Sequence, residues 1–184
     1  MTRSQSVAGV VLAAGEGKRF GGPKAPFEYE GERLVDRSVR TLREAGCDPV
    51  FVILGAWEGP VDHATVIVNH GWGEGMGSSL RIALKWVNAT TEAGDALITL
   101  VDLPGLTSDA VKRVIDSPAG IAVATFDGER GHPVRIPRTH FQELIDTVAG
   151  DEGARGFLVG RDDITFVEVA DIADGADLDV APHA

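Results

Sequence analysis

Apolar and polar positions along the chain follow a pattern in which strands and helices take turns. Val7–Leu12 is a continuous apolar run, typical of a strand that is buried on both faces of a parallel sheet. Similar runs predict further strands at Val50–Leu54, Thr65–Val68, residues 96–101 and residues 164–169. Apolar residues recur at helical spacing between several of these runs, so we expect helices in those connections.

The start of each predicted helix is marked by a capping side chain or by the first apolar residue of the helical pattern. Their expected first residues are Leu34, Ser78 or Ser79 as an N-cap, Thr107 as an N-cap, and Thr139 in a capping box with Gln142. Arginines on the polar side of the first of these helices are interpreted as a solvated face, and they are Arg33, Arg37, Arg40 and Arg43.

The second half of the chain changes character. Ile121–Phe126 and residues 133–136 flank the turn-rich segment 127–132 (DGERGH), which predicts two paired antiparallel strands. The alternation elsewhere predicts a mostly parallel sheet with helices on both faces. We therefore expect one α/β domain over residues 1–184, with a small antiparallel element in its second half.

Composition narrows the range of partners. The 184 residues include 28 acidic and 17 basic side chains, giving a formal net charge of -11. Such a field disfavours nucleic acid and anionic membranes, so a polyanionic small ligand would need local cations and a divalent metal. Cys47 is the only cysteine, which excludes an intrachain disulfide. Residues 1–6 lack the apolar region of a signal peptide, and the expected location is the cytoplasm.

A glycine-rich loop follows the first strand directly. Residues 12–24 read LAAGEGKRFGGPK, and Lys18, Arg19 and Lys24 supply cations within it. Small residues let backbone N–H groups approach phosphates closely, so the loop predicts a triphosphate site, the alternative being a flexible turn. A dinucleotide fingerprint would need glycine at Phe20, and a Walker A loop would need lysine at Pro23.

Two further segments carry candidate chemistry. Asp102 ends the strand at residues 96–101, where a carboxylate faces the ligand crevice of a parallel sheet and can hold Mg²⁺. The alternative is a turn or helix-capping aspartate. Residues 69–80 (NHGWGEGMGSSL) place Asn69, Ser78 and Ser79 before a helix, which suits recognition of a ring or simple capping.

These segments together resemble a known family. Residues 12–24 resemble the LAAGxSxRMGxxK signature of nucleotidyltransferases, with Gly17 replacing the usual hydroxyl residue. Residues 100–104 resemble that family's LxDxP motif. Residues 69–80, 131–134 and 150–155 resemble the NxxWxxGMxSSL, GxP and GDxGAR segments of molybdenum cofactor cytidylyltransferases. The tail at residues 177–180 (DLDV) partly resembles a DIDTPEDL ending. The resemblance spans residues 7–179.

The resemblance implies a three-layer, Rossmann-like nucleotidyltransferase fold. It also implies Mg²⁺-dependent transfer of a nucleoside monophosphate to a phosphorylated acceptor, most simply a molybdopterin-type cofactor. Ala14 favours CTP over GTP, because its methyl group leaves less room for a base. The catalytic candidates are Arg19, Lys24 and Asp102. The nucleotide-binding candidates are Leu12, Ala13, Ala14, Gly15, Lys18, Arg19, Lys24, Asn69, Ser78, Ser79 and Asp102.

For the acceptor, the resemblance implies His132 and Arg155, although a histidine of this kind is as often structural. For the metal it implies Asp102 and, from the tail, Asp179. Three other functions stay open at this point. They are transfer to a sugar or alditol phosphate, a non-catalytic nucleotide-binding regulator, and a nicotinamide-dependent oxidoreductase, which the broken dinucleotide fingerprint disfavours.

Overall fold

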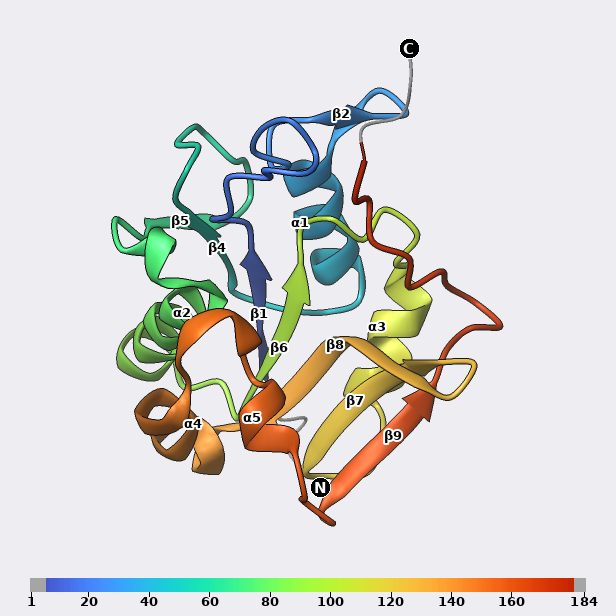
Figure 1. Ribbon diagram of the computed structural model, residues 1–184. Helices are drawn as coiled ribbons and strands as arrows, with labels where there is room; N and C mark the ends of the chain where they lie inside the picture. Colours follow the sequence, from blue (N-terminus) through green and yellow to red (C-terminus); the bar gives the residue numbers. More distant parts are fainter. Residues whose placement is uncertain (1–5, 181–184) are drawn as a thin grey trace.

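The computed structural model describes residues 6–180 and forms three layers, with helices on both faces of a central sheet (Figure 1). The strands are β1 (Val7–Leu12), β2 (Glu28–Tyr29), β3 (Glu32–Arg33), β4 (Val50–Leu54), β5 (Thr65–Val68), β6 (Asp95–Leu100), β7 (Ile121–Phe126), β8 (Glu129–Pro137) and β9 (Ile164–Glu168). The helices are α1 (Leu34–Glu44), α2 (Met76–Thr90), α3 (Ser108–Ile115), α4 (Phe141–Thr147) and α5 (Arg155–Leu158), with short 3₁₀ helices η1 (Trp72–Glu74), η2 (Arg138–His140) and η3 (Gly150–Glu152).

The main sheet has seven strands in the order β5-β4-β1-β6-β8-β7-β9. Strands β5, β4, β1 and β6 are parallel, while β8 runs antiparallel to both β6 and β7. All the predicted strands of the sheet are present. The expected antiparallel pair is confirmed, but it is part of the main sheet, and β8 begins at Glu129, so that the turn is shorter than the DGERGH segment.

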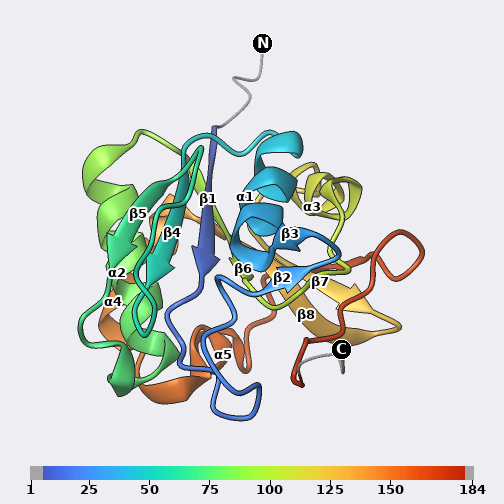
Figure 2. The same ribbon diagram turned by 90° about the horizontal axis from the view of Figure 1, so that it is seen from above.

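The sheet separates two apolar cores, and Figure 2 shows from above the helices that lie on its two sides. Helices α1 and α3 cover one face, and α2, α4 and α5 cover the other. Strand β1 serves both, because Val7 and Val11 face the first core while Ala8, Val10 and Leu12 face the second. This two-sided burial explains why β1 is a continuous apolar run rather than an alternating one.

Two of the three predicted helix caps are wrong. Thr107 does cap α3, and its Oγ1 accepts the Ala110 N–H at 3.2 Å. Helix α2 instead begins at Met76, so Ser78 and Ser79 lie inside its first turn.

Thr139 and Gln142 do not form a capping box, because Thr139 lies in η2 and α4 follows His140. The turn at η2 is fixed by Arg138, whose guanidinium donates to the carbonyls of Ala93, Asn88, Val87 and Thr91 at the end of α2.

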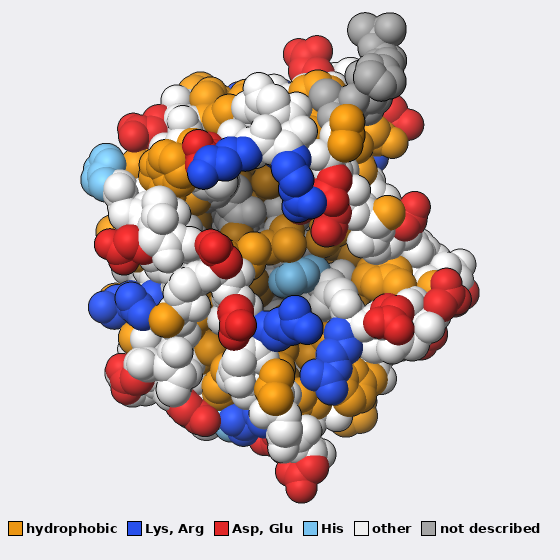
Figure 3. Space-filling model, in the orientation of Figure 1, with side chains coloured by type: hydrophobic (Ala, Val, Ile, Leu, Met, Phe, Trp, Pro, Cys, Tyr) orange, Lys and Arg blue, Asp and Glu red, His pale blue; other side chains and the backbone are white. Residues whose placement is uncertain are grey.

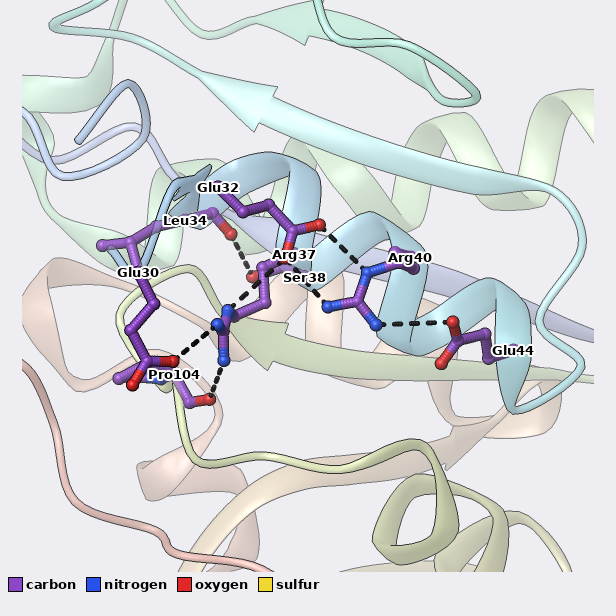
Figure 4. Close-up of polar contacts among 8 residues, drawn as sticks. All are labelled: Glu30, Glu32, Leu34, Arg37, Ser38, Arg40, Glu44 and Pro104. Carbon is purple, nitrogen blue, oxygen red and sulfur yellow. Dashed lines mark hydrogen bonds and ion pairs between the residues drawn. The ribbon is translucent and has the colours of Figure 1, made fainter. Parts of the chain in front are cut away.

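The polar side of α1 is more than a solvated face (Figure 4). Arg40 pairs with Glu32 and Glu44 near the surface, as expected. Arg37, however, donates to the Pro104 carbonyl at 3.1 Å and pairs with Glu30 at 3.0 Å. It thereby ties α1 to the segment that follows Asp102. Within residues 6–180, no helix has the length and apolar character needed to cross a membrane.

Candidate functional site

A cavity of about 420 Å³ opens where the carboxyl ends of β1 and β6 meet the start of α2. This is the edge of a parallel sheet at which α/β proteins bind ligands. Lys and Arg side chains gather around the hollow in Figure 3. The cavity is lined by Leu12, Ala13, Ala14, Gly15, Glu16, Gly17, Lys18, Lys24, Trp72, Gly73, Gly75, Met76, Ser79, Leu100, Val101, Asp102 and Asp151.

The loop after β1 closes around one carbonyl group. The Gly17 carbonyl accepts the N–H groups of Phe20, Gly21 and Gly22 at 2.9–3.1 Å. In contrast, the N–H groups of residues 14–19 donate to no acceptor within the part of the chain that the structure describes. Unpaired N–H groups beside a cavity form a site for an anion.

Glycine is required at position 17 for a steric reason. Its φ angle is 63°, in the left-handed region, and a Cβ atom there would lie 1.9 Å from the Gly22 carbonyl oxygen. The departure from the usual serine is therefore part of how this loop is built.

Each cation of the loop has a carboxylate partner. Lys18 Nζ lies 2.8 Å from Glu16, and the hydrogen bond to that carboxylate raises the pKa of Lys18. The Arg19 guanidinium lies 3.5 Å from Asp179. Lys24 Nζ lies 2.6 Å from Asp102 Oδ2. Lys18 and Arg19 are mostly exposed, whereas the side chains of Lys24 and Asp102 are only 15% and 16% exposed.

One oxygen of the Asp102 carboxylate has no hydrogen-bond donor among the described residues. Its Oδ1 is buried and accepts no hydrogen bond from any residue in 6–180. Helix α3 is capped by Thr107, which excludes Asp102 as the cap of that helix. A buried carboxylate oxygen without a donor fits a hard cation such as Mg²⁺ or Mn²⁺. Residues 6–180 hold no cluster of three metal-binding side chains, so the other ligands would be phosphate oxygens and water.

The tail lies across this carboxylate. The Leu178 N–H donates to the Asp102 carbonyl at 2.9 Å, which brings Asp179 to 3.8 Å from Lys24 Nζ. Sequence reasoning missed Asp177, whose pKa is raised by burial and by the negative charges of Asp102 and Asp179. The two aspartates of DLDV are thus both near Asp102, and their spacing was the available signal.

Asn69, Ser78 and Ser79 are brought together, but largely with one another. Asn69 is 1% exposed, and its Nδ2 donates to Ser78 Oγ at 2.8 Å and to Ser79 Oγ at 3.0 Å. Its Oδ1 accepts the Gly71 N–H at 2.9 Å. Of the three, Ser79 alone lines the cavity. This network shapes the wall of the cavity, and direct contact of Asn69 and Ser78 with a nucleotide stays a prediction.

Neither of the two predicted acceptor residues lines the cavity. His132 lies on β8, and burial lowers its pKa to about 4, although the negative charge of Asp102 acts in the opposite direction. Arg155 begins α5, is exposed, and does not line the cavity. Asp151 of the same segment does line it, because residues 149–151 pack against Gly75 and Gly77 at the start of α2.

Comparison with known proteins matches this arrangement to a family. The family model described as the MobA-like NTP transferase domain matches residues 9–164. The chain belongs to this nucleotidyltransferase family. The fold and the family expected from the loop and Asp102 motifs are thereby confirmed.

Relatives of this MobA-like chain carry two kinds of name. "Nicotine blue oxidoreductase" of Paenarthrobacter nicotinovorans is 38% identical over 192 residues, covering 94% of this chain and 92% of the relative. "Probable molybdenum cofactor guanylyltransferase" of Mycobacterium ulcerans (strain Agy99) is 32% identical over 185 residues, covering 96% of this chain and 90% of the relative.

Among solved structures, Rv0371c from Mycobacterium tuberculosis H37Rv superposes with a TM-score of 0.79 at 30% identity, covering 97% of this chain and 95% of that chain. A complex of Rv0371C with manganese has a TM-score of 0.73 at 29% identity, covering 89% and 88%. Both likenesses support the three-layer fold.

Proposed function

We propose that this protein transfers a nucleoside monophosphate from a nucleoside triphosphate to a phosphorylated acceptor and releases pyrophosphate. The observation that carries the proposal is the meeting of two features at one cavity. These are the free N–H groups of residues 14–19 and the Asp102 carboxylate with its unpaired Oδ1. The first suits a triphosphate, and the second suits the metal that such a ligand carries.

The residues divide the work as follows. The N–H groups of the loop hold the phosphate chain, while Lys24 and Arg19 neutralise charge that develops on the transferred group and on departing pyrophosphate. Asp102 would hold a divalent cation, which supplies further charge neutralisation. The phosphate of the acceptor is already ionised, so no general base is needed. Burial lowers the pKa of His132, so its imidazole is neutral at neutral pH and can position an acceptor without adding a net charge.

For the metal we propose Mg²⁺ held by Asp102, with Asp179 as a second ligand. The distance of Asp179 from Lys24 supports its place in the same cluster. The manganese complex of the related structure supports a divalent cation in the family. The proposed compartment is the cytoplasm.

Two observations bear on the base, and they support different nucleotides. The loop motif with Ala14 supports CTP, whereas the relatives named molybdenum cofactor guanylyltransferase support GTP. Ala14 lines the cavity but is only 6% exposed and belongs to an apolar core, so its methyl group presents little surface to a base. Direct competition between CTP and GTP decides the point. Ala14→Gly tests the steric argument, which requires a shift toward GTP.

The acceptor we propose is a molybdopterin-type phosphate. The names of the mycobacterial relatives support it, and His132 and Arg155 are its candidate contacts. A sugar phosphate is the comparison substrate in the assay.

The experiment that tests the function measures pyrophosphate release with Mg²⁺, each triphosphate and each acceptor. Asp102→Asn should lose at least a factor on the order of 10²–10³ in rate, because the metal ligand is removed. Circular dichroism should show an unchanged fold, since the amide oxygen of asparagine can still accept the hydrogen bond that Lys24 donates to Asp102. A folded Asp102→Asn protein with near-normal turnover would refute the assignment.

A second candidate is an oxidoreductase, and the relative at 38% identity favours it. The fingerprint broken at Phe20 counts against a nicotinamide cofactor in the loop. Titration with NADH and NADPH separates the two functions. Saturable binding of either, together with its oxidation by an added acceptor and no pyrophosphate release with any triphosphate, would establish the oxidoreductase instead.

A further inference from the structure

The Lys24 ammonium group contacts two carboxylates and an aromatic ring. Its Nζ lies 2.6 Å from Asp102 Oδ2 and 3.8 Å from Asp179 Oδ1. The ring of Phe20 lies 5.8 Å away and covers the ammonium group. Its side chain is 15% exposed. Lys24 therefore neutralises the same carboxylate that fits a divalent cation.

We infer that Lys24 and the divalent cation compete for Asp102, so that the metal enters together with the triphosphate rather than before it. This inference rests on the proposed function, because it takes Asp102 as the metal ligand. Two cations that contact one carboxylate repel each other strongly at the low effective dielectric of a mostly buried site. A metal alone must therefore overcome the charge of Lys24.

A triphosphate removes this obstacle. Its oxygens give the Lys24 ammonium another partner beside the N–H groups of residues 14–19. When Lys24 turns to the phosphates, Asp102 loses its cation partner, and Asp179 keeps only Arg19, which lies 3.5 Å away. The two ligands thus favour each other's binding, as linkage between two sites requires.

Lys18 provides a matched control within the same loop. It carries the same charge and lines the same cavity. Its Nζ, however, pairs with Glu16 at 2.8 Å, its side chain is 80% exposed, and it has no ion pair with Asp102. Lys18→Met and Lys24→Met therefore change the net charge equally, and only the second frees Asp102.

The experiment measures two affinities for each variant by calorimetry at neutral pH. The first is the affinity for Mn²⁺ alone, checked by the loss of the electron paramagnetic resonance signal of free Mn²⁺. The second is the affinity for the Mn²⁺ complexes of GTP and CTP. Thermal melts confirm that each variant is folded.

For Lys24→Met we expect opposite changes. Mn²⁺ alone should bind at least about tenfold more tightly than to the wild type, because the competing charge is gone. The Mn²⁺–nucleotide complexes should bind at least about tenfold more weakly, because a charge-assisted contact to phosphate is lost. Lys24→Arg keeps a cation beside Asp102 and should retain weak Mn²⁺ binding. Lys18→Met should change the affinity for Mn²⁺ alone by no more than about twofold.

The outcomes separate this inference from the proposed function. If Asp102→Asn abolishes Mn²⁺ binding while Lys24→Met raises it no more than Lys18→Met does, the metal site stands and the competition is refuted. If Asp102→Asn binds Mn²⁺ as the wild type does, the metal assignment itself fails. Tight binding of Mn²⁺ alone to the wild type, equal to that of Lys24→Met, would also refute the competition.

Discussion

Replacing Gly17 by the serine that is usual in related loops should weaken nucleotide binding rather than improve it. A Cβ atom at this position would lie 1.9 Å from the Gly22 carbonyl oxygen, so the loop cannot keep its path. Serine would also have to adopt the left-handed conformation that Gly17 has at a φ of 63°. Gly17→Ser therefore tests whether this loop geometry forms the phosphate site.

The cost can be worked out from the loop itself. The left-handed conformation costs a non-glycine residue about 1–2 kcal/mol. Moving the Gly17 carbonyl away from Gly22 loses up to three hydrogen bonds, each worth about 0.5–1.5 kcal/mol net. The total is about 3–6 kcal/mol if no other contact replaces the lost hydrogen bonds. The loop is at the surface and can relax into water, so we expect only about 1–2 kcal/mol to reach global stability, or roughly 2–8 °C in Tm.

The assay is calorimetric binding of GTP and CTP with Mg²⁺, together with a thermal melt. Binding should weaken by at least about tenfold, because the loop that carries the unpaired N–H groups of residues 14–19 changes its path. Gly15→Ser is the control for the melt, since a Cβ there meets nothing within 4 Å. Wild-type affinity in folded Gly17→Ser would show that the loop adopts another path, and the argument from its geometry would fail.

Three other changes have defined outcomes. Arg135 is 3% exposed and donates hydrogen bonds to backbone carbonyls at and after the end of α3, so Arg135→Met should cost about 2–4 kcal/mol of stability and lower Tm by roughly 4–16 °C. Replacing the exposed Arg130 by Met is the control and should have little effect, so equal melting temperatures of the two variants would contradict this prediction. Backbone N–H groups lower the pKa of Glu168 from 4.5 to about 2, so the ionised carboxylate stabilises the fold. The wild type should melt at a higher temperature than Glu168→Gln above pH 4.5, and this difference should shrink as the pH falls toward 2. A difference that does not change with pH would exclude the ionised carboxylate as its source. Burial lowers the pKa of His132 from 6.5 to about 4, so the folded protein favours the neutral imidazole, and Tm should fall as the pH is lowered from 6.5 to 4. His132→Asn should flatten this part of the plot of Tm against pH, and an unchanged slope would contradict the prediction.

The strands could be predicted because burial on two faces leaves a direct trace in the sequence. Val7–Leu12 and Val50–Leu54 have no polar side to interrupt their apolar runs. The helix starts were harder, since the same serine can cap a helix or bond to a distant group. Ser78 and Ser79 satisfy Asn69 instead, and Gly75 supplies the turn before α2. A local pattern cannot show which partner a hydroxyl will find.

Some residues of the candidate site could also be predicted from the sequence, and others could not. The glycine-rich loop at residues 12–24 and Asp102 come directly after buried strands, and their residue types could be recognised from the chain alone. The opposite wall could not, because Trp72, Met76 and Asp151 reach the cavity through tertiary packing. Asp151 is carried there by a loop that packs against Gly75, where a Cβ would lie 2.5 Å from the Gly150 carbonyl. Glycine spacing of this kind has meaning only once the two segments are known to touch.

The pairing of charges in the site explains how a chain with a net charge of -11 can bind a polyanion. Three cations of the loop each face one carboxylate, as Lys18 faces Glu16, Arg19 faces Asp179 and Lys24 faces Asp102, so the positive charge of each is already balanced. A bare triphosphate that took the cations would leave these carboxylates uncompensated beside it. A triphosphate that brings its own divalent cation restores the balance at Asp102 and Asp179. We therefore expect the protein to bind the metal complex of the nucleotide more tightly than the free nucleotide.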